Sequence, residues 1–557
     1  MGTVEHALAP RRVPPAAQAR GAARPRASAA CVVGPVLGAL ALGLAWLIVH
    51  PATADLAAQE YRTGLWRRGG FAIWDAQWYG GHHEPGYSLL FGPLAALLGP
   101  RALGFVAGVV AVAALTVIAR RQERFPRLVG WLFAAGVMTN VLIGRVPFVL
   151  GIALGALAWL CADAQRRRPA MLALAALLAL ATVWASPPAG LFLALAGAAR
   201  RLSGERRDTA AAIALAVPPI VGGLAVAIAF PEGGRDHFAA SAFWPTFALG
   251  LAGLALLDPR RRALRLGVLA ALVLLVAAFV VPTSVGQTAL RPLVILGPAV
   301  LALGLRPGGR RVLVAAVVVG AGLLYLQWLP AVRAIAEAAG DPSTKGSYYS
   351  EVLRIVDRER EPGERLEIPL TRNHWEAAVV APRIPLARGW HRQLDEEANP
   401  LFYDRRPLTA MRYEEWLYDR AVRWVALPNV PLDFSARREA ALLRSGGVPG
   451  LRLVLRSENW TIWEVLPVPP PATGPARLAG AGTDSFQLAV REPGRIRVRA
   501  TYTPYWTIVR GDGCIERGRD GLTEVVARRA GTLRVEARLS VAGALGRARS
   551  CTVPAGS

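Results

Sequence analysis

Long apolar runs in the first 330 residues constrain this chain more than any other feature. Eleven runs lie near residues 31–49, 102–119, 128–143, 147–162, 170–184, 188–199, 210–230, 243–257, 266–281, 292–305 and 312–329. A helix that crosses the hydrocarbon core of a bilayer needs about 17–25 predominantly apolar residues. Several runs are shorter, and residues 188–199 are also compatible with a bent hairpin formed with the preceding run. The sequence therefore predicts a polytopic α-helical membrane protein with about 11 transmembrane helices over residues 31–330.

Charge is distributed unevenly along the chain. Residues 1–329 contain 30 basic and 12 acidic side chains, whereas residues 330–557 contain 34 and 27. The first part is poor in acids, and the second has the composition of a soluble protein. All basic residues except Lys345 are arginines, which partly reflects a GC-rich genome. The net charge of +25 is therefore not a nucleic-acid-binding signature, and we expect no nucleic-acid partner.

The arginines predict the orientation of the chain in the plasma membrane. They cluster at every second connection, within residues 120–127, 166–168, 200–207, 260–265 and 306–311, and also in the N-terminal tail, residues 1–30. Because basic residues accumulate in cytoplasmic loops, we expect a cytoplasmic N-terminus and an extracytoplasmic half after residue 330. A cleavable signal peptide ending near residues 52–54 is an alternative. Its apolar core of about 19 residues exceeds the usual 7–15, so we favour a retained span.

The connection between the first two runs, residues 50–101, is the longest one on the predicted external side. It contains Asp55, Glu60, Asp75 and Glu84, a third of the acids of residues 1–329. The apolar stretch of residues 85–98 is too short to cross a bilayer. We therefore expect it to form a helix that lies along the outer membrane surface.

The order of features in this region resembles a known class of membrane enzymes. A first span is followed by Asp55, a long external loop, an aromatic-Gly-His-x-Pro segment, a Pro-rich interfacial helix and Gly-Pro-Arg. This order is similar to the GT-C glycosyltransferases, and motif-level similarity is confined to about residues 52–101. The resemblance implies a GT-C-like fold and sugar transfer from a polyprenyl-phosphate carrier at the outer membrane face. It also implies an essential acid at Asp55, although the acid pair common in the class is absent because Leu56 follows Asp55.

The same conclusion can be approached from chemistry. Transfer of a sugar from a lipid phosphate needs a carboxylate that takes the proton of the acceptor hydroxyl. Carboxylates near the hydrocarbon are costly and are therefore functional candidates. We expect Asp55 to be the catalytic base of an inverting transferase, with Asp75 or Glu60 as the next choices. The alternative is that these acids only solvate the loop or pair with its arginines.

Cations must hold the phosphate leaving group. Arg145 and Arg291 lie in short connections on the same predicted side as Asp55, and a guanidinium donates two parallel hydrogen bonds to phosphate. We expect both to bind substrate, with snorkelling toward lipid headgroups as the alternative. Arg235 is a weaker candidate because Asp236 is available to pair with it.

His82, His83 and Tyr79 are further candidates for substrate binding. Adjacent histidines on an extended segment point to opposite faces, so we do not expect both to bind one metal ion. One of them orients a carboxylate or substrate, or each makes only a structural hydrogen bond. Tyr79 is placed to stack on a sugar, or it belongs to the aromatic belt of the interface. No cofactor is expected. A divalent metal ion stays an open alternative, although no ligand motif indicates one.

The external half divides into two parts by pattern. Residues 331–465 alternate between helix-like and strand-like runs and predict an α/β module. Within it, residues 387–406 are polar and aromatic, and we favour a solvated surface loop over a carbohydrate-facing one. A Pro-rich linker over residues 466–477 precedes a β-sandwich over residues 478–557. Cys514 and Cys551 are expected to form a disulfide in this oxidising location.

These features favour a transferase whose partners are membrane lipid, a polyprenyl-phosphate sugar donor and a cell-envelope glycan or lipid acceptor. The alternatives are a transporter, a scaffold that binds cell-wall polymer, and a degenerate transferase retained for binding. Transporters commonly carry internal repeats and polar, broken helices at the bilayer midplane. We find no repeat, and the polar residues are concentrated on one face, which favours chemistry on a lipid-borne substrate.

Overall fold

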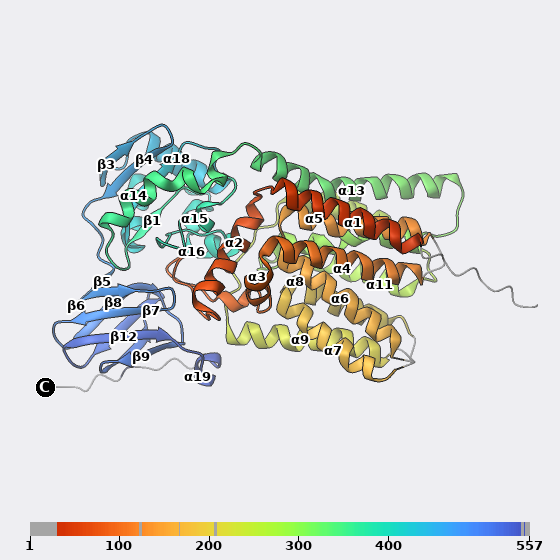
Figure 1. Ribbon diagram of the computed structural model, residues 1–557, viewed down its shortest axis with the longest axis horizontal. Coiled ribbons are helices and arrows are strands. Elements are labelled where there is room, and N and C mark those ends of the chain that lie inside the picture. The colour runs from red at the N-terminus through yellow and green to blue at the C-terminus, as the bar shows by residue number, and fades with distance from the viewer. Residues whose placement is uncertain (1–29, 122–124, 166–167, 205–208, 547–550, 552–557) are drawn as a thin grey trace, which may run out of the picture.

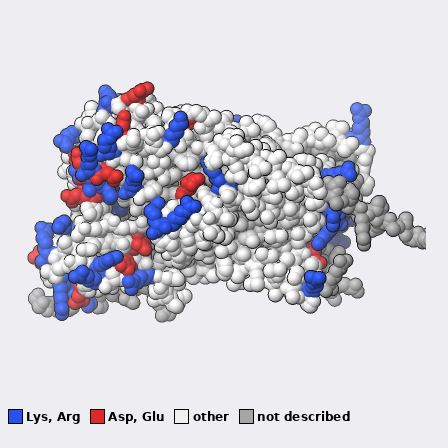
Figure 2. Space-filling model, in the orientation of Figure 1, with Lys and Arg blue, Asp and Glu red and all other residues white. Residues whose placement is uncertain are grey.

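The structure is a computed structural model that describes residues 30–121, 125–165, 168–204, 209–546 and 551. A bundle of helices occupies one end of an elongated molecule, and two β-containing parts occupy the other (Figure 1). On the face shown in Figure 2, charged side chains lie over both ends of the molecule, and the bundle surface between them is almost free of charge. This distribution is the one expected for a protein whose middle part is surrounded by lipid.

Each of the eleven apolar runs lies in a helical segment. These segments are α1 (Ala30–Val49), α4 (Pro100–Arg120), α5 (Pro126–Ile143), α6 (Val146–Ala164), α7 (Ala170–Ala185), α8 (Pro187–Leu202), α9 (Thr209–Ala229), α10 (Ala240–Leu256), α11 (Arg262–Val280), the succession η3 (Gly286–Leu290), η4 (Pro292–Leu296) and α12 (Gly297–Gly304), and α13 (Arg310–Ala338). Among the described residues, eight segments are long and apolar enough to span a membrane, while α7 and α10 are shorter apolar helices. The expectation of a multi-pass helical protein is confirmed.

Small residues allow the helices of the bundle to approach one another closely. A Cβ at Gly151 of α6 would lie 2.6 Å from the Cβ of Ala189 in α8, and one at Gly190 would lie 2.4 Å from the Cβ of Val183 in α7. Such close contacts are the usual means of packing helices in lipid, because burial of apolar surface there contributes little to helix association. Large apolar side chains such as Leu224 and Val273 are exposed on the outside of the bundle, where lipid would contact them.

The connection of residues 50–101 contains a helix that we did not predict. The segments after α1 are α2 (Ala54–Gly69), η1 (Glu84–Gly86) and α3 (Phe91–Leu98). Residues 54–60 are good helix formers except Asp55, which interacts favourably with the helix dipole because it lies in the first turn of α2. The apolar stretch of residues 85–98 forms only the short η1 and α3, and α3 packs on α2. These elements lie between the bundle and the β-containing parts (Figure 1).

The part that follows α13 is a small α/β module. Its sheet has the order β1-β2-β4-β3, in which only the β1–β2 pair is parallel. The strands are β1 (Arg365–Glu367), β2 (Val422–Pro428), β3 (Leu451–Arg456) and β4 (Trp460–Val465), and the helices are α14 (Ser350–Glu359), α15 (Glu376–Val379), α16 (Arg392–Ala398), α17 (Ala410–Asp419) and α18 (Arg437–Arg444), with short turns η5 (Pro342–Thr344), η6 (Gly346–Tyr349), η7 (Pro400–Phe402) and η8 (Phe434–Ala436).

An ion cluster is buried inside this module. The guanidinium of Arg388 lies 2.6 Å from a carboxylate oxygen of Asp395 and 3.4 Å from one of Glu439, and it stacks on the ring of Phe402. Burial raises the pKa of Glu439 to about 7, and burial together with the neighbouring Glu439 raises that of Glu367 above its usual range. Arg388 precedes α16 and Asp395 lies inside it, so their pairing ties the start of this segment to the helix.

The C-terminal part is a β-sandwich of two four-stranded sheets with the orders β10-β11-β8-β5 and β6-β7-β12-β9. Its elements are β5 (Ala472–Thr473), β6 (Ala476–Ala481), β7 (Ser485–Val490), β8 (Gly494–Thr501), β9 (Trp506–Arg510), β10 (Gly513–Arg517), β11 (Leu522–Ala527), β12 (Gly531–Ala537) and α19 (Val541–Ala544). Cys514 and Cys551 form a disulfide.

We expected residues 466–477 to form a Pro-rich linker, but part of this segment belongs to the sandwich. Ala472 and Thr473 pair with Val498 and Arg497, so this segment supplies the edge strand of one sheet. Prolines are compatible with such an edge because they need no partner for a backbone N–H there. The sandwich therefore begins inside the segment that we predicted to be a linker.

Candidate active site

Asp55 lies in the first turn of α2, at the rim of the bundle that faces the two β-containing parts. Its carboxylate forms an ion pair with Arg145, which precedes α6, with 2.9 Å between Oδ2 and Nε. The start of α2 is held against the end of α5 because the hydroxyl of Thr53 donates to the carbonyl of Ile143 at 2.6 Å. Gly144 has a φ of +91°, and a Cβ there would lie 3.0 Å from the backbone nitrogen of Leu56. Glycine is required at this close approach.

Arg291 joins the same group from a distant part of the chain. It stands between η3 and the π-helical η4, and its guanidinium lies 4.7 Å from the ring centroid of Phe148 in α6. It interacts electrostatically with Asp55, Arg145 and Asp236. Asp236 accepts a hydrogen bond from the backbone N–H of Gln287 at 3.0 Å, and so it supports the turn that leads to Arg291.

The structure thus brings together three of the residues predicted from the sequence, namely Asp55, Arg145 and Arg291. The Asp55 and Arg145 side chains are 22% and 30% exposed, so a ligand can reach both. The carboxylate can accept a proton. The two guanidinium groups beside it can bind a phosphate at the same place.

A polar face of α2 extends this group. Asp55, Gln59 and Arg62 are spaced i, i+4 and i+7, which places them on one side of the helix. The Gln59 amide donates to the hydroxyl of Tyr87 at 3.0 Å, and the Arg62 guanidinium lies 3.6 Å from the centroid of the Tyr87 ring. Arg62 also donates to a carboxylate oxygen of Glu84 at 2.7 Å. Sequence reasoning missed Gln59 and Arg62, although their helical spacing was a usable signal.

Glu60 and Asp75 are not part of this group. Glu60 is five residues after Asp55 and therefore lies about 140° away around α2; its nearest cationic partner is Arg101, at 3.9 Å. Asp75 is buried, and it accepts hydrogen bonds from the hydroxyl of Tyr61 at 2.8 Å and from the backbone N–H of Gln77 at 2.9 Å. Burial raises the pKa of both acids.

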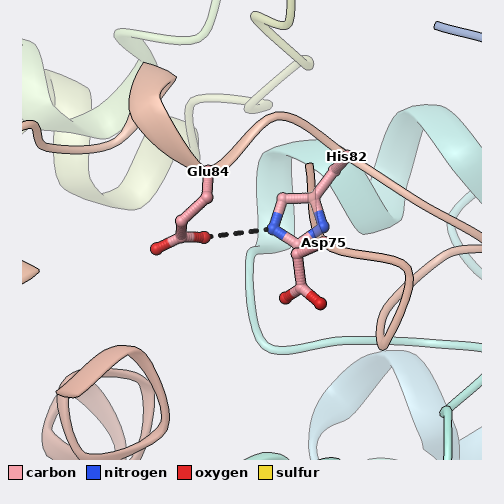
Figure 3. A group of neighbouring side chains, drawn as sticks. All are labelled: Asp75, His82 and Glu84. Carbon is pink, nitrogen blue, oxygen red and sulfur yellow. Dashed lines mark ion pairs between the residues drawn. The ribbon is translucent and has the colours of Figure 1, made fainter. Parts of the chain in front are cut away.

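The two histidines and Tyr79 connect the loop to other parts of the protein. His82 stacks on Trp78 with 5.5 Å between the ring centroids, and its Nε2 lies 3.4 Å from an oxygen of Glu84 (Figure 3). His83 is oriented differently: its Nδ1 lies 2.9 Å from Glu232, and its Nε2 lies 3.0 Å from the hydroxyl of Thr503 in the sandwich. The Tyr79 hydroxyl donates to the carbonyl of His391 at 2.9 Å. Sequence reasoning missed Glu232 and Thr503, and no local pattern indicates them.

The α/β module covers the start of α2. The indole N–H groups of Trp375 and Trp390 donate to the carbonyls of Ala52 and Ala54, each at 2.8 Å. His391 lies edge-on to Tyr87, with 5.2 Å between the ring centroids. Burial, assisted by the positive charge of Arg62, holds the pKa of His391 well below its usual range, so its imidazole is neutral.

Our prediction that residues 387–406 form a solvated surface loop is therefore wrong. Arg388, Asp395 and Asn399 of this segment are buried, and the segment contains α16 and η7. Its polar side chains satisfy one another: Asn399 donates to Asp395 at 2.8 Å, as Arg388 does at 2.6 Å. The segment is part of the contact between the module and the connection of residues 50–101.

No model of a known protein family and no curated protein matches the chain. The solved structures that are similar to it include two of one protein. ArnT from Cupriavidus metallidurans bound to undecaprenyl phosphate is 12% identical with a TM-score of 0.44, over 80% of this chain and 100% of that chain. The same protein in the apo state is 12% identical with a TM-score of 0.38, over 77% and 98% of the two chains. A likeness of this degree does not by itself indicate a shared activity.

Proposed function

We propose that this protein is a GT-C-type inverting glycosyltransferase. It moves a sugar from a polyprenyl-phosphate carrier to a hydroxyl group of a cell-envelope glycan or lipid at the outer membrane face. The observation that supports this proposal is the grouping of Asp55, Arg145 and Arg291 at the rim of an apolar helical bundle. In this proposal the N-terminal tail is cytoplasmic and the two β-containing parts are extracytoplasmic, as the arginine clusters indicate.

The reaction is a single displacement. The oxygen of the acceptor hydroxyl forms a bond to the anomeric carbon of the sugar, and the bond from that carbon to the phosphate oxygen breaks. Asp55 takes the hydroxyl proton, and the polyprenyl phosphate leaves with the bonding electron pair. Because the acceptor attacks opposite to the leaving group, the configuration at the anomeric carbon inverts.

The two arginines neutralise the leaving group. Arg145 is paired with Asp55 at 2.9 Å. A bound phosphate competes with Asp55 for this guanidinium, and Asp55 is then released to accept the proton. Arg291, held against the ring of Phe148, supplies a second cation whose position does not depend on Asp55.

The α/β module contributes to the acceptor side of this site. Trp390 binds the backbone of α2 at Ala54, next to the proposed base, and His391 lies against Tyr87 on the polar face of α2. A neutral imidazole can accept or donate a hydrogen bond to a sugar hydroxyl without competing with the carboxylate for a proton. We assign His391 a positioning role for the acceptor.

The test is transfer of labelled sugar from a set of polyprenyl-phosphate sugars to envelope acceptors by the purified protein in lipid nanodiscs. General base catalysis contributes roughly 10²–10⁴-fold, so Asp55→Asn should lower the transfer rate by about that factor. Asp163→Asn is the matched control, because Asp163 is also paired with an arginine, Arg200, at 2.7 Å, but it lies at the other end of α6 from Arg145. It should retain wild-type transfer.

Two outcomes contradict the proposal. Equal transfer by wild type and Asp55→Asn removes Asp55 from the mechanism. Absence of transfer by the wild type with every carrier favours the transporter or the cell-wall-binding scaffold.

A further inference from the structure

The loop between α2 and η1 contains a second group of chemically active side chains that the transfer reaction does not use. Asp75, His82 and Glu84 each present one donor atom, and these three atoms all lie within 4.8 Å of one another. Figure 3 shows the Glu84 carboxylate and the His82 ring turned toward each other, with Asp75 beside the ring. We propose that this group binds one divalent transition-metal ion, for which Zn²⁺ is the best fit.

The spacing of the donors suits such an ion. The Nε2 of His82 and the Oε2 of Glu84 are 3.4 Å apart, which is too long for a strong charge-assisted hydrogen bond. Zinc binds imidazole nitrogen and carboxylate oxygen at about 2.0–2.2 Å in a tetrahedral arrangement, and two such ligands are then roughly 3.4 Å apart. The observed distance between these two atoms is therefore the separation expected for two ligand atoms of one zinc ion.

Buried donor atoms of this group have no hydrogen-bond partner among the described residues. These atoms are both ring nitrogens of His82 and the Oε2 of Glu84. His82 is only 3% exposed, so water is not freely available to it. Buried polar atoms without a partner are rare in native proteins and call for an explanation. A metal ion supplies the absent partner for one nitrogen of His82 and for Glu84.

The remaining carboxylate oxygens are oriented as those of metal ligands usually are. The two Asp75 oxygens accept hydrogen bonds from the Tyr61 hydroxyl and from the backbone N–H of Gln77. The Oε1 of Glu84 accepts from the side chain of Arg62, which leaves its Oε2 facing His82. Such outer contacts fix ligand orientation in metalloproteins. Two carboxylates also balance the charge of a divalent ion.

The ion would have a structural role. Asp75 and His82 already exchange backbone hydrogen bonds, at 2.8 and 3.0 Å, which close the turn that carries Trp78 and Tyr79. A metal ion joins the two ends of this turn to Glu84 at the start of η1. It thereby stabilises the contact of Tyr79 with the carbonyl of His391 in the α/β module.

Metal content of the full-length protein tests this proposal independently of any transferase activity. The protein is purified in detergent without a histidine tag, and a chelator removes bound metal. It is then incubated with Zn²⁺ and freed of unbound metal, and its zinc content is measured by inductively coupled plasma mass spectrometry. We expect about one zinc ion per chain in the wild type, and a loss of this ion in both His82→Asn and Asp75→Asn. We also expect the chelator to lower the melting temperature of the wild type, with zinc restoring it.

His374 provides a matched control. It is a buried histidine between two carboxylates, but Glu376 faces its Nδ1 at 3.7 Å and Asp433 faces its Nε2 at 3.6 Å, so the two acids cannot share one ion with it. His374→Asn should retain the zinc. Zinc content that is equal in the wild type and in Asp75→Asn, or a wild type that binds none, overturns the proposal. If His82→Asn does not fold, the wild-type stoichiometry and Asp75→Asn still decide it.

Discussion

Replacement of the buried Arg388 by methionine tests how the α/β module holds its contact with the membrane part. The Arg388 guanidinium is 1% exposed and pairs with Asp395 and Glu439. Removal of one partner from a buried ion pair costs about 3–5 kcal/mol because a charge is left buried without compensation. Asn399 and Tyr403 also donate to Asp395, and Glu439 can take up a proton. We therefore expect the lower end of this range, about 3 kcal/mol.

The control is a pair with similar geometry and different burial. Arg412 lies 2.8 Å from Asp404, and the two side chains are 28% and 31% exposed. Exposed pairs contribute about 0–1 kcal/mol, so Arg412→Met should change little. For a domain of this size, 1 kcal/mol corresponds to about 2–4 °C in melting temperature. Arg388→Met should therefore lower it by about 6–12 °C.

Tryptophan emission during heating of the full-length protein reports this change, because Trp416, Trp424 and Trp460 lie in the module core. A shift of equal size in the two variants would refute the reasoning, because burial would then not determine the cost. A stabilised Arg388→Met would refute it as well, since the carboxylates would not need the guanidinium.

Three further predictions follow from named groups. Because burial raises the pKa of Glu439 to about 7 from about 4.5, the unfolded chain loses this proton at lower pH than the folded one. Stability should therefore fall as pH rises from about 4.5 to about 7, with up to about 1.4 kcal/mol per pH unit from this group, and Glu439→Gln should reduce this slope in melting curves while the buried Glu367 keeps its own contribution. If His391 positions the acceptor, His391→Ala should raise the acceptor KM by about fivefold with a smaller effect on kcat, since a net hydrogen bond contributes about 1 kcal/mol. An unchanged KM contradicts this role. In intact cells, a membrane-impermeant thiol reagent should label Ser445→Cys and not Gly309→Cys in a background without Cys31 and Cys161; the reverse pattern contradicts the proposed orientation.

Much of the membrane part could be predicted from the sequence because lipid imposes simple rules on it. Apolar runs must form helices that satisfy their own backbone hydrogen bonds, so each run corresponds to a helical segment. The alternation of arginine clusters placed Asp55, Arg145 and Arg291 on one side of the membrane. That restricted them to a thin layer, and the structure brings them together there.

The parts that could not be predicted depend on contacts between distant segments. α2 has mixed composition, and its buried residues Gln59 and Arg62 both contact Tyr87, which lies 25 or more residues further along the chain. Residues 387–406 have the composition of a surface loop, but Arg388 and Asn399 both donate to Asp395, and all three side chains are buried. Composition alone cannot distinguish polar groups that pair internally from polar groups that face water.

The candidate metal group shows a similar limit. Asp75, His82 and Glu84 do not have the spacing of a common zinc motif, so local pattern gave no reason to combine them. They meet because the chain turns back on itself between Asp75 and His82, as their two backbone hydrogen bonds show. The sequence reasoning considered whether His82 and His83 share an ion, whereas the structure directs them to different partners.

The position of a bound polyprenyl phosphate tests the central claim most directly. The measurement is an experimental structure of the protein in nanodiscs with such a lipid, at a resolution that places its phosphate. The account predicts that phosphate oxygens lie about 3 Å from the guanidinium groups of Arg145 and Arg291, with the Asp55 carboxylate beside them and free of Arg145. A phosphate bound elsewhere on the protein, with the pair of Asp55 and Arg145 intact, would contradict it.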